Sequence, residues 1–344
     1  MNNNILMVRE NIRELLPYTS AREEYSGTKG IFLDANENPE GTYNRYPDPL
    51  QSALKAKLSA WKGALPENIF IGNGSDEVID LAFRIFCEPH QEKALTFTPT
   101  YGMYSVAAQI NAVPLISLPL TQDFQINREA LSPWLEQEEL KLILLCSPNN
   151  PSGNLLRKAD VKWILESFRG IVLIDEAYVD FCPQNSFLSS LGQYSRLIIS
   201  QTLSKAAGLA GLRLGIAYAH KDIIRYYNKV KAPYNISTTN QEAALSLLKT
   251  PATLKQQVHQ IRTEKIRLVN ALRVLKRVKQ IYPSDTNFIL VEVDDANLMY
   301  EQLRNHNIIV RNRHTEVSNC LRITVGSPAE NEQLITTLNT LDHA

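Results

Sequence analysis

Two hydrophobic patterns alternate along residues 50–219. Short, almost continuous apolar runs are typical of strands buried on both faces, whereas apolar residues that recur at helical spacing are typical of amphipathic helices. The apolar runs lie at residues 69–71, 94–97, 140–146, 171–174, 197–200 and 214–219. The helical patterns lie at residues 50–61, 78–86, 101–110 and 158–168. This alternation predicts an α/β fold, a mostly parallel sheet with helices on both faces, whose site lies beyond the carboxyl ends of the strands.

Both ends of the chain depart from this alternation. Residues 1–40 look like an arm, with an amphipathic piece at residues 5–16 that Pro17 ends. From Thr250 onward we predict a long amphipathic helix, a strand at 288–293, a helix at 297–305, strands at 308–310 and 321–325, and a last helix. We therefore expect a large domain over residues 41–270 and a smaller α/β domain over residues 271–344.

The composition argues against several classes of protein. Lys plus Arg and Asp plus Glu are equal at 36 each, which gives no reason to expect nucleic acid or an anionic membrane as a partner. The 4 cysteines are far apart and the 6 histidines show no ligand spacing, so we predict neither a disulfide framework nor a metal site. Because no signal-peptide pattern or long apolar run is present, we expect a soluble cytoplasmic protein.

Lys205 is the candidate for a reactive amine. It ends the hydroxyl-bearing segment 202–205, just past the apolar run at 197–200, and Arg213 follows in front of the next run. A lysine that is desolvated or flanked by cations gives up its proton more readily and can form a Schiff base with an aldehyde. Taken alone, a loop lysine is usually solvated, so the reactive role depends on its companions elsewhere in the chain.

One group of companions follows the first strand. Gly74, Ser75 and Asp76 open a helix directly after it, with Ser75 as the predicted N-cap. The backbone N–H groups of that first turn would face an anion with the favourable end of the helix dipole. This segment is therefore a candidate phosphate cradle.

Two further strand ends carry polar side chains. Asn150 lies in the turn after the run at 140–146, and Asp175 and Tyr178 follow the run at 171–174. An Asn-Pro-Ser-Gly turn and an acid at a strand end are each ordinary turn or capping chemistry when taken alone. Their meaning comes from occurring together with Lys205.

Together these groups specify pyridoxal phosphate. This cofactor needs a lysine for its aldehyde, a cradle for its phosphate, a carboxylate against its ring nitrogen and donors to its ring hydroxyl. Asp175 would keep the ring nitrogen protonated, and Asn150 and Tyr178 would hydrogen-bond the ring oxygen. The phosphate would be held by backbone N–H groups, hydroxyls and one guanidinium, from Gly74, Ser75, Asp76, Thr202, Ser204 and Arg213.

The ordered set of motifs resembles the fold-type I aminotransferases of the aspartate aminotransferase superfamily. The motifs are Asn-Pro-Ser-Gly, Asp-Glu-Ala-Tyr, Thr-Leu-Ser-Lys and Gly-Leu-Arg, in that order along the chain. The resemblance covers nearly the whole chain and implies that Tyr101 stacks on the ring of the cofactor. The alternative for Tyr101 is an aromatic core anchor of the following helix.

Further segments resemble the histidinol-phosphate aminotransferase family. They are the Leu-Leu-Pro-Tyr that ends in Tyr18, the stretch around Asn36, the Arg-Tyr-Pro-Asp-Pro around Tyr46 and the Cys-Leu-Arg-Ile-Thr-Val-Gly around Arg322. Ser152 and Ala207 depart from the residues commoner there, without a consequence for the chemistry.

That resemblance implies a substrate site and a homodimer. Arg322 would bind the acidic group of the substrate and Arg311 would assist. The alternative for Arg311 is a surface charge with no substrate contact. Tyr18 and Asn36 would line the site from the arm, which contributes to the small domain and the dimer. Tyr46 would reach the cofactor phosphate of the neighbouring subunit.

The expected reaction moves an amino group between glutamate and imidazole-acetol phosphate, giving 2-oxoglutarate and histidinol phosphate in histidine biosynthesis. Lys205 would carry the proton between the substrate α-carbon and carbon C4′ of the cofactor, in a ping-pong sequence. Two rivals share the scaffold, an aromatic aminotransferase and a threonine-phosphate decarboxylase. A third, from another class, is a non-catalytic regulatory protein that binds pyridoxal phosphate.

Overall fold

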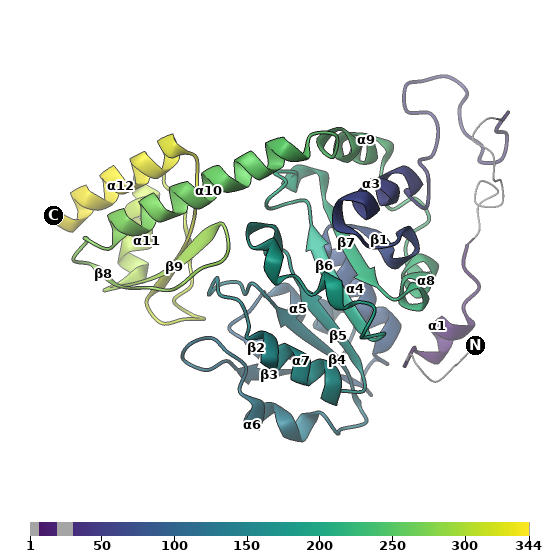
Figure 1. Ribbon diagram of the computed structural model, residues 1–344, viewed down its shortest axis with the longest axis horizontal. Coiled ribbons are helices and arrows are strands. Elements are labelled where there is room, and N and C mark those ends of the chain that lie inside the picture. Colours follow the sequence, from purple (N-terminus) through teal and green to yellow (C-terminus); the bar gives the residue numbers. More distant parts are fainter. Residues whose placement is uncertain (1–6, 19–29, 344) are drawn as a thin grey trace.

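The computed structural model describes residues 7–18 and 30–343 and contains two β-sheets (Figure 1). The larger sheet has 7 strands and the smaller has 4. Within the described residues, no helix combines the length and the apolar composition needed to cross a bilayer, and no cluster of His, Cys, Asp and Glu side chains is suited to a metal ion.

The larger sheet is parallel except for one strand. Its strands are β1 (Ile69–Asn73), β2 (Lys93–Thr98), β3 (Leu115–Pro119), β4 (Leu140–Cys146), β5 (Ile171–Asp175), β6 (Leu197–Thr202) and β7 (Leu214–Ala219). They lie in the order β1-β7-β6-β5-β4-β2-β3, with β7 antiparallel to both of its neighbours. The predicted mostly parallel sheet is confirmed, and the half-exposed strand β3 is an addition that the apolar runs did not reveal.

Helices cover both faces of this sheet. They are α3 (Ser52–Lys62), α4 (Ser75–Phe86), α5 (Met103–Ile110), α6 (Arg128–Leu131), α7 (Lys158–Ser167), α8 (Lys221–Val230) and α9 (Thr238–Leu247). One core lies on the face covered by α3 and α7, and a second core lies on the face covered by α4, α5 and α8. Single-turn 3₁₀ helices lie at Pro66–Asn68, Ser132–Trp134, Val179–Phe181, Pro183–Asn185, Leu188–Ser190 and Ala210–Leu212.

The smaller sheet is antiparallel and packs one face against three helices. Its strands β8 (Val278–Ile281), β9 (Phe288–Val293), β10 (Arg311–Asn312) and β11 (Cys320–Thr324) lie in the order β10-β11-β9-β8. The helices are α10 (Pro251–Leu272), α11 (Ala296–Asn305) and α12 (Pro328–His343). A third core joins these helices to the sheet. Helix α10 runs from beside α9 to the small sheet (Figure 1), through the expected domain boundary at residue 270, which remains a prediction.

One strand prediction here was wrong. The apolar residues 308–310 are not a strand; the strand that pairs with β11 is β10, where Arg311 lies opposite Arg322. The apolar side chains of Ile308 and Val310 instead pack against the core of the small sheet. The apolar pattern therefore predicted correctly that these residues pack against the core, but it did not predict which residues form the strand.

The N-terminal segment has little regular structure. Helix α1 (Glu10–Glu14) is shorter than the predicted piece at residues 5–16, part of which lies outside the described residues. The backbone N–H of Arg9 donates to the carbonyl of Ile85 at 3.0 Å, and Lys229 Nζ donates to the carbonyl of Arg13 at 2.8 Å. These contacts hold α1 against α4 and α8.

Candidate active site

A cavity lies at the carboxyl ends of β4, β5 and β6. It holds about 460 Å³ of space that protein atoms do not occupy, part of it continuous with solvent. Most of its lining had been singled out as site residues: Ser75, Asp76, Tyr101, Asn150, Asp175, Tyr178, Thr202, Ser204, Lys205 and Arg213, with Cys146 and Ala177 in addition. Side chains separated by more than a hundred residues thus meet where the parallel strands end, as the position of sites in open α/β sheets predicts.

Asp175 is a buried carboxylate at the last position of β5. It lies beside Cys146 of β4 and Ser200 of β6 in the strand register and is 2% exposed. Its Oδ1 accepts a hydrogen bond from the backbone N–H of Ala177 at 3.1 Å, and its Oδ2 accepts one from the hydroxyl of Tyr104 at 2.9 Å. Burial raises the pKa of Asp175 to about 6, against the opposing effect of these hydrogen bonds. A cation placed beside it would therefore be strongly favoured.

Lys205 extends from the loop after β6 into the cavity. Its Nζ lies 5.7 Å from the ring centroid of Tyr178. Although the cavity is open enough to leave the side chain exposed, desolvation and then the charge of Arg322 lower the pKa of its ammonium group, and Asp175 partly opposes them. A lowered pKa increases the fraction of neutral amine, the form that reacts with an aldehyde.

The predicted phosphate cradle forms at the start of α4. Gly74 has a positive φ of 81°, and its N–H donates to the carbonyl of Arg213 at 2.7 Å. Arg213 itself has a φ of 51°, rare for a residue with a side chain. Its Nη2 lies 3.1 Å from Asp76 Oδ2, so Asp76 holds the guanidinium against the helix N-terminus. The prediction that Ser75 caps α4 was wrong, because Gly74 occupies the cap position and Ser75 is the first helical residue.

Hydroxyl groups after β6 face the same side of the cavity. The hydroxyls of Thr202 and Ser204 lie 3.0 Å apart, and the backbone N–H of Ser204 donates to Thr202 Oγ1 at 3.1 Å. Both residues line the cavity together with Arg213 and the first turn of α4. N–H groups, hydroxyls and a guanidinium therefore converge on one end of the cavity, an arrangement suited to a phosphate group.

The small sheet contributes Arg322 to the site. From β11 its Nη1 donates a short hydrogen bond to Oδ1 of the buried Asn150, and its guanidinium lies 5.2 Å from the ring centroid of Phe288. The buried Nε of Arg322 has no acceptor among the described residues. Desolvation lowers the pKa of this guanidinium, and the charge of Tyr178 opposes that effect. An arginine with a free buried donor is a candidate anchor for an anion.

Arg311 is more exposed than Arg313, a neighbour that the sequence motifs do not mark. Arg311 is exposed, whereas the side chain of Arg313 is 13% exposed and its buried Nε has no acceptor among the described residues. Both lie on the face of the ladder that carries Arg322, since Arg313 N–H donates to the carbonyl of Cys320. The charge of Arg313 also acts on the ionisation of Tyr178. Arg313 could have been identified as a site candidate from the sequence, because it is charged and lies two residues from Arg311, on the same face of the strand.

Two tyrosines each donate a hydrogen bond to a carboxylate: Tyr104 in α5 and Tyr101 in the loop before it. The hydroxyl of Tyr101 donates to Asp76 Oδ1 at 3.0 Å, and its ring lies edge-on to that of Tyr104, 5.7 Å between centroids. Tyr101 lines the cavity, so its predicted stacking on a cofactor ring stays a prediction that the geometry permits. The sequence reasoning passed over Tyr104, because a tyrosine within an amphipathic helix resembles any core aromatic residue.

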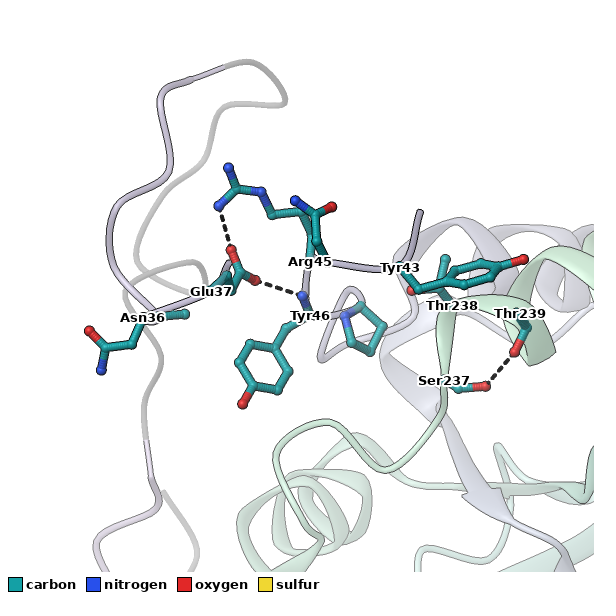
Figure 2. Close-up of a pocket in the computed structure, with 11 residues that line it drawn as sticks. Asn36, Glu37, Tyr43, Arg45, Tyr46, Ser237, Thr238 and Thr239 are labelled. Atoms are coloured by element: carbon teal, nitrogen blue, oxygen red, sulfur yellow. Dashed lines mark hydrogen bonds and ion pairs between the residues drawn. The ribbon is translucent and has the colours of Figure 1, made fainter. Parts of the chain in front are cut away.

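Three predicted site residues of the N-terminal segment lie outside this cavity within one chain. Tyr18 is exposed and lines a separate groove with Arg225. Asn36 and Tyr46 line another open pocket of about 900 Å³, shown in Figure 2. Tyr46 stacks on the ring of Tyr234 at 4.4 Å between centroids. Their predicted roles remain predictions, and that of Tyr46 concerns a neighbouring subunit from the outset.

The residues of the main cavity fit pyridoxal phosphate on chemical grounds. A buried carboxylate without an ion pair among the described residues suits a protonated ring nitrogen, and the convergent donors suit a phosphate. The close packing of the Arg213 guanidinium on Gly74 supports this, because a Cβ added to Gly74 would lie 2.7 Å from Arg213 Nη2. Lys205 lines the same cavity.

Comparisons with known proteins agree with this arrangement. Residues 24–338 match the family model for aminotransferase class I and II. A relative from Parabacteroides distasonis named histidinol-phosphate aminotransferase is 48% identical over 338 residues, which cover 97% of this chain and 98% of the relative.

Solved structures confirm the fold. That of the histidinol-phosphate aminotransferase from Clostridium acetobutylicum has a TM-score of 0.80 and 23% identity, covering 88% of this chain and 91% of the other. The L-threonine-O-3-phosphate decarboxylase from Porphyromonas gingivalis has a TM-score of 0.73 and 23% identity, covering 88% and 92%. Since enzymes of two reaction types share the architecture, the fold alone does not select the reaction.

Proposed function

Because the chain belongs to the class I and II aminotransferases, we propose that it is a pyridoxal-phosphate enzyme that exchanges an amino group between histidinol phosphate and 2-oxoglutarate. The products are imidazole-acetol phosphate and glutamate. The proposal is supported by the 48% identity, over nearly full length, to a relative that carries this name. The observation that carries it is the meeting of Lys205 and Asp175 at one cavity, with Arg322 bonded to Asn150 in the lining of that cavity.

The residues of the cavity hold the cofactor in a fixed orientation. When bound, pyridoxal phosphate supplies an aldehyde that links to amines and a ring that withdraws electrons from the substrate α-carbon. Asp175 would pair with the ring nitrogen, while Asn150 and Tyr178 would donate to the ring oxygen. The first turn of α4, the hydroxyls of the segment 202–204 and Arg213, which line the same cavity, would hold the phosphate.

Lys205 is the catalytic residue. Its amine would hold the cofactor until the amino substrate takes its place, and it would then take the proton from the substrate α-carbon and deliver it to the cofactor carbon that carried the aldehyde. The surroundings lower the pKa of Lys205, so a neutral amine is available to accept that proton. The open side of the cavity leaves room for the amine to move between these tasks.

Arg322 anchors the acidic group that both substrates carry next to the reacting carbon. In glutamate this group is a carboxylate, and in histidinol phosphate it is a phosphate on a CH2 group. One planar guanidinium binds either anion through paired N–H donors. Arg313 and Arg311 lie on the same face of the small sheet and add positive charge where the doubly charged phosphate needs it most.

The working form is a homodimer in the cytoplasm. Eight of the 16 exposed large hydrophobic side chains among the described residues lie between residues 15 and 50: Leu15, Leu16, Tyr18, Ile31, Leu33, Tyr43, Tyr46 and Leu50. Apolar residues gathered on one segment indicate a protein interface. A second copy of the chain that covers this segment would bring Tyr46 to its own cofactor phosphate. The 4 cysteines are free and buried, as in a reducing compartment.

The test is a single half-reaction with the pyridoxal form of the purified enzyme. Glutamate and histidinol phosphate should each convert it to the pyridoxamine form, with histidinol phosphate showing the highest specificity constant among amines tested, tyrosine and phenylalanine included. Arg322→Gln should lower the specificity constants for both substrates by about 100-fold or more, because the charged bond is lost in binding and reaction alike.

Three outcomes would contradict the proposal in different ways. Release of CO2 from threonine phosphate would identify a decarboxylase on the same scaffold. A preference for tyrosine or phenylalanine over histidinol phosphate would identify an aromatic aminotransferase. Binding of the cofactor with no turnover of any amine would identify a regulatory protein.

A further inference from the structure

Tyr104 makes the one side-chain hydrogen bond to Asp175 found among the described residues. Its ring is fully buried in α5, and its hydroxyl donates to Asp175 Oδ2 at 2.9 Å. Residue 104 points into the core shared by α4, α5 and the large sheet, with Ala107 and Ala108 beside it. The hydroxyl therefore reaches Asp175 from behind, from the core and not from the open cavity.

The remaining surroundings of Asp175 are neutral or distant. The other carboxylate oxygen accepts from the backbone N–H of Ala177, and the neighbours in the strand register are Cys146 and Ser200. Among the described residues no lysine, arginine or histidine forms an ion pair with Asp175, and the charges that face it are those of Asp76 and Lys205. The carboxylate thus depends on two neutral donors for its ionised form.

We propose that Tyr104 is a positioning residue that orients the Asp175 carboxylate toward the cofactor ring nitrogen and holds it in its ionised form. The inference rests on the proposed function for the identity of the cofactor. It adds a residue that does not touch the cofactor and acts through Asp175 alone.

The tyrosine is suited to this role because it stays protonated. Burial and the adjacent Asp175 charge raise the pKa of the Tyr104 phenol well above its usual value, so it remains a donor at every working pH. Asp175, whose pKa is raised to about 6, titrates close to neutrality. Removal of a donor to the charged form raises that pKa further, by about one to two pH units for a hydrogen bond to a charged group.

Tyr104→Phe removes the hydroxyl and keeps the ring. The affinity of the apoenzyme for pyridoxal phosphate should fall about 2- to 10-fold at pH 7, because less Asp175 is ionised. In wild type the affinity falls as the pH drops through the Asp175 titration, and in the variant this midpoint should lie about one to two pH units higher. Both quantities come from absorbance titrations of apoenzyme with cofactor across pH, so they need no turnover.

Tyr227→Phe is the matched control. Tyr227 is also fully buried and donates to a backbone carbonyl, that of Val78 at 3.0 Å, in the same core but with no bond to a site residue. It should lose comparable stability and keep the wild-type affinity and midpoint. Equal shifts in both variants, or an unchanged midpoint in Tyr104→Phe, would overturn the inference.

A double variant separates the inference from general damage. In an Asp175→Asn background, Tyr104→Phe should cause no further shift of the pH midpoint, since the group through which it acts is gone. A further shift of the same size in that background would show that Tyr104 acts elsewhere. Wild-type protein that binds no pyridoxal phosphate would refute the proposed function instead, and no variant would be needed to see it.

Discussion

The strand-end cavity and the N-terminal segment differ in how their side chains are held. The cavity is built from residues of one chain, and buried neighbours fix its carboxylate and cradle. The segment from Ile31 to Leu50 is exposed, and its side chains are tied mainly to each other, as where Glu37 binds the guanidinium of Arg45 and the N–H of Tyr46 (Figure 2).

This difference suggests that the cavity serves the reaction, whereas the N-terminal segment serves the pairing of subunits. The cavity contains all the groups that a proton transfer needs, so its function can be argued from one chain. The arm presents apolar side chains to solvent, which costs solvation free energy unless another surface covers them. Changes in the cavity should therefore act on chemistry in every copy, whereas changes in the arm should act only through the pairing of copies.

The largest effect should follow from Lys205→Ala. Loss of the amine should lower turnover by about 10⁴-fold or more, since covalent attachment and proton transfer are both lost. Borohydride treatment followed by peptide mass analysis should find the cofactor on residue 205 in wild type and on no lysine in the variant. Lys57→Ala, on the exposed face of α3, is the control and should match wild type. Cofactor fixed to another lysine in wild type would refute the assignment.

Asp175→Asn should have the next largest effect and should also change stability. Turnover should fall by about 10²–10³-fold, because a neutral amide lacks the negative charge that keeps the ring nitrogen protonated. The apoenzyme, however, should be stabilised relative to wild type at neutral pH. Isothermal urea unfolding of the two apoenzymes at several pH values measures this contrast.

The sign of the stability change follows from the raised pKa. Folded Asp175 holds its proton up to a pH of about 6, whereas the unfolded chain releases it near its ordinary value. Between these pH values the folded state binds more protons, so stability falls as pH rises, by about 3 kcal/mol in total. The variant lacks this loss. A stability difference that did not change between pH 4 and pH 8 would show that Asp175 titrates normally.

Tyr46→Ala should have the smallest effect and should distinguish the arm from the cavity. Alone it should lower turnover about 10-fold, through the loss of one hydrogen bond to the phosphate. Mixed with Lys205→Ala chains after unfolding and refolding, it should regain activity, because half the dimers then contain one site with both Lys205 and the partner's Tyr46 intact. Equal mixing should give roughly a quarter of wild-type activity with exchange between subunits, and about a twentieth without it.

Much of the cavity could be predicted because strand ends carry chemically distinct residue types in a fixed order. The roles of Lys205, Asp175 and Arg213 follow from what pyridoxal phosphate requires, and the structure brings all three to one cavity. Hydrophobic runs also placed most strands of the large sheet. Those runs failed for β3 and β8, whose half-exposed residues lack a continuous apolar pattern.

What could not be predicted depends on orientation within an element. Tyr104 and Tyr101 lie three residues apart, yet only the packing of α5 shows that one meets Asp175 and the other Asp76. Arg311 and Arg313 share a strand face, and only their burial separates them. Gly74 caps α4 in place of Ser75 because the backbone there needs a positive φ, which propensity for side-chain capping does not register.

The position of β1 has a consequence for the order of events during synthesis. The first strand of the large sheet lies at its edge and pairs with the last, where Ile69 meets Tyr218 and Asn73 meets Leu214. While the ribosome makes the intervening strands, β1 has no partner, and the turn at Gly74 cannot meet Arg213. Such distant pairings form slowly because a long loop must close first. The phosphate cradle can therefore assemble only after β7 is made. We expect the chain to bind the cofactor only once all strands of the large sheet have been synthesised.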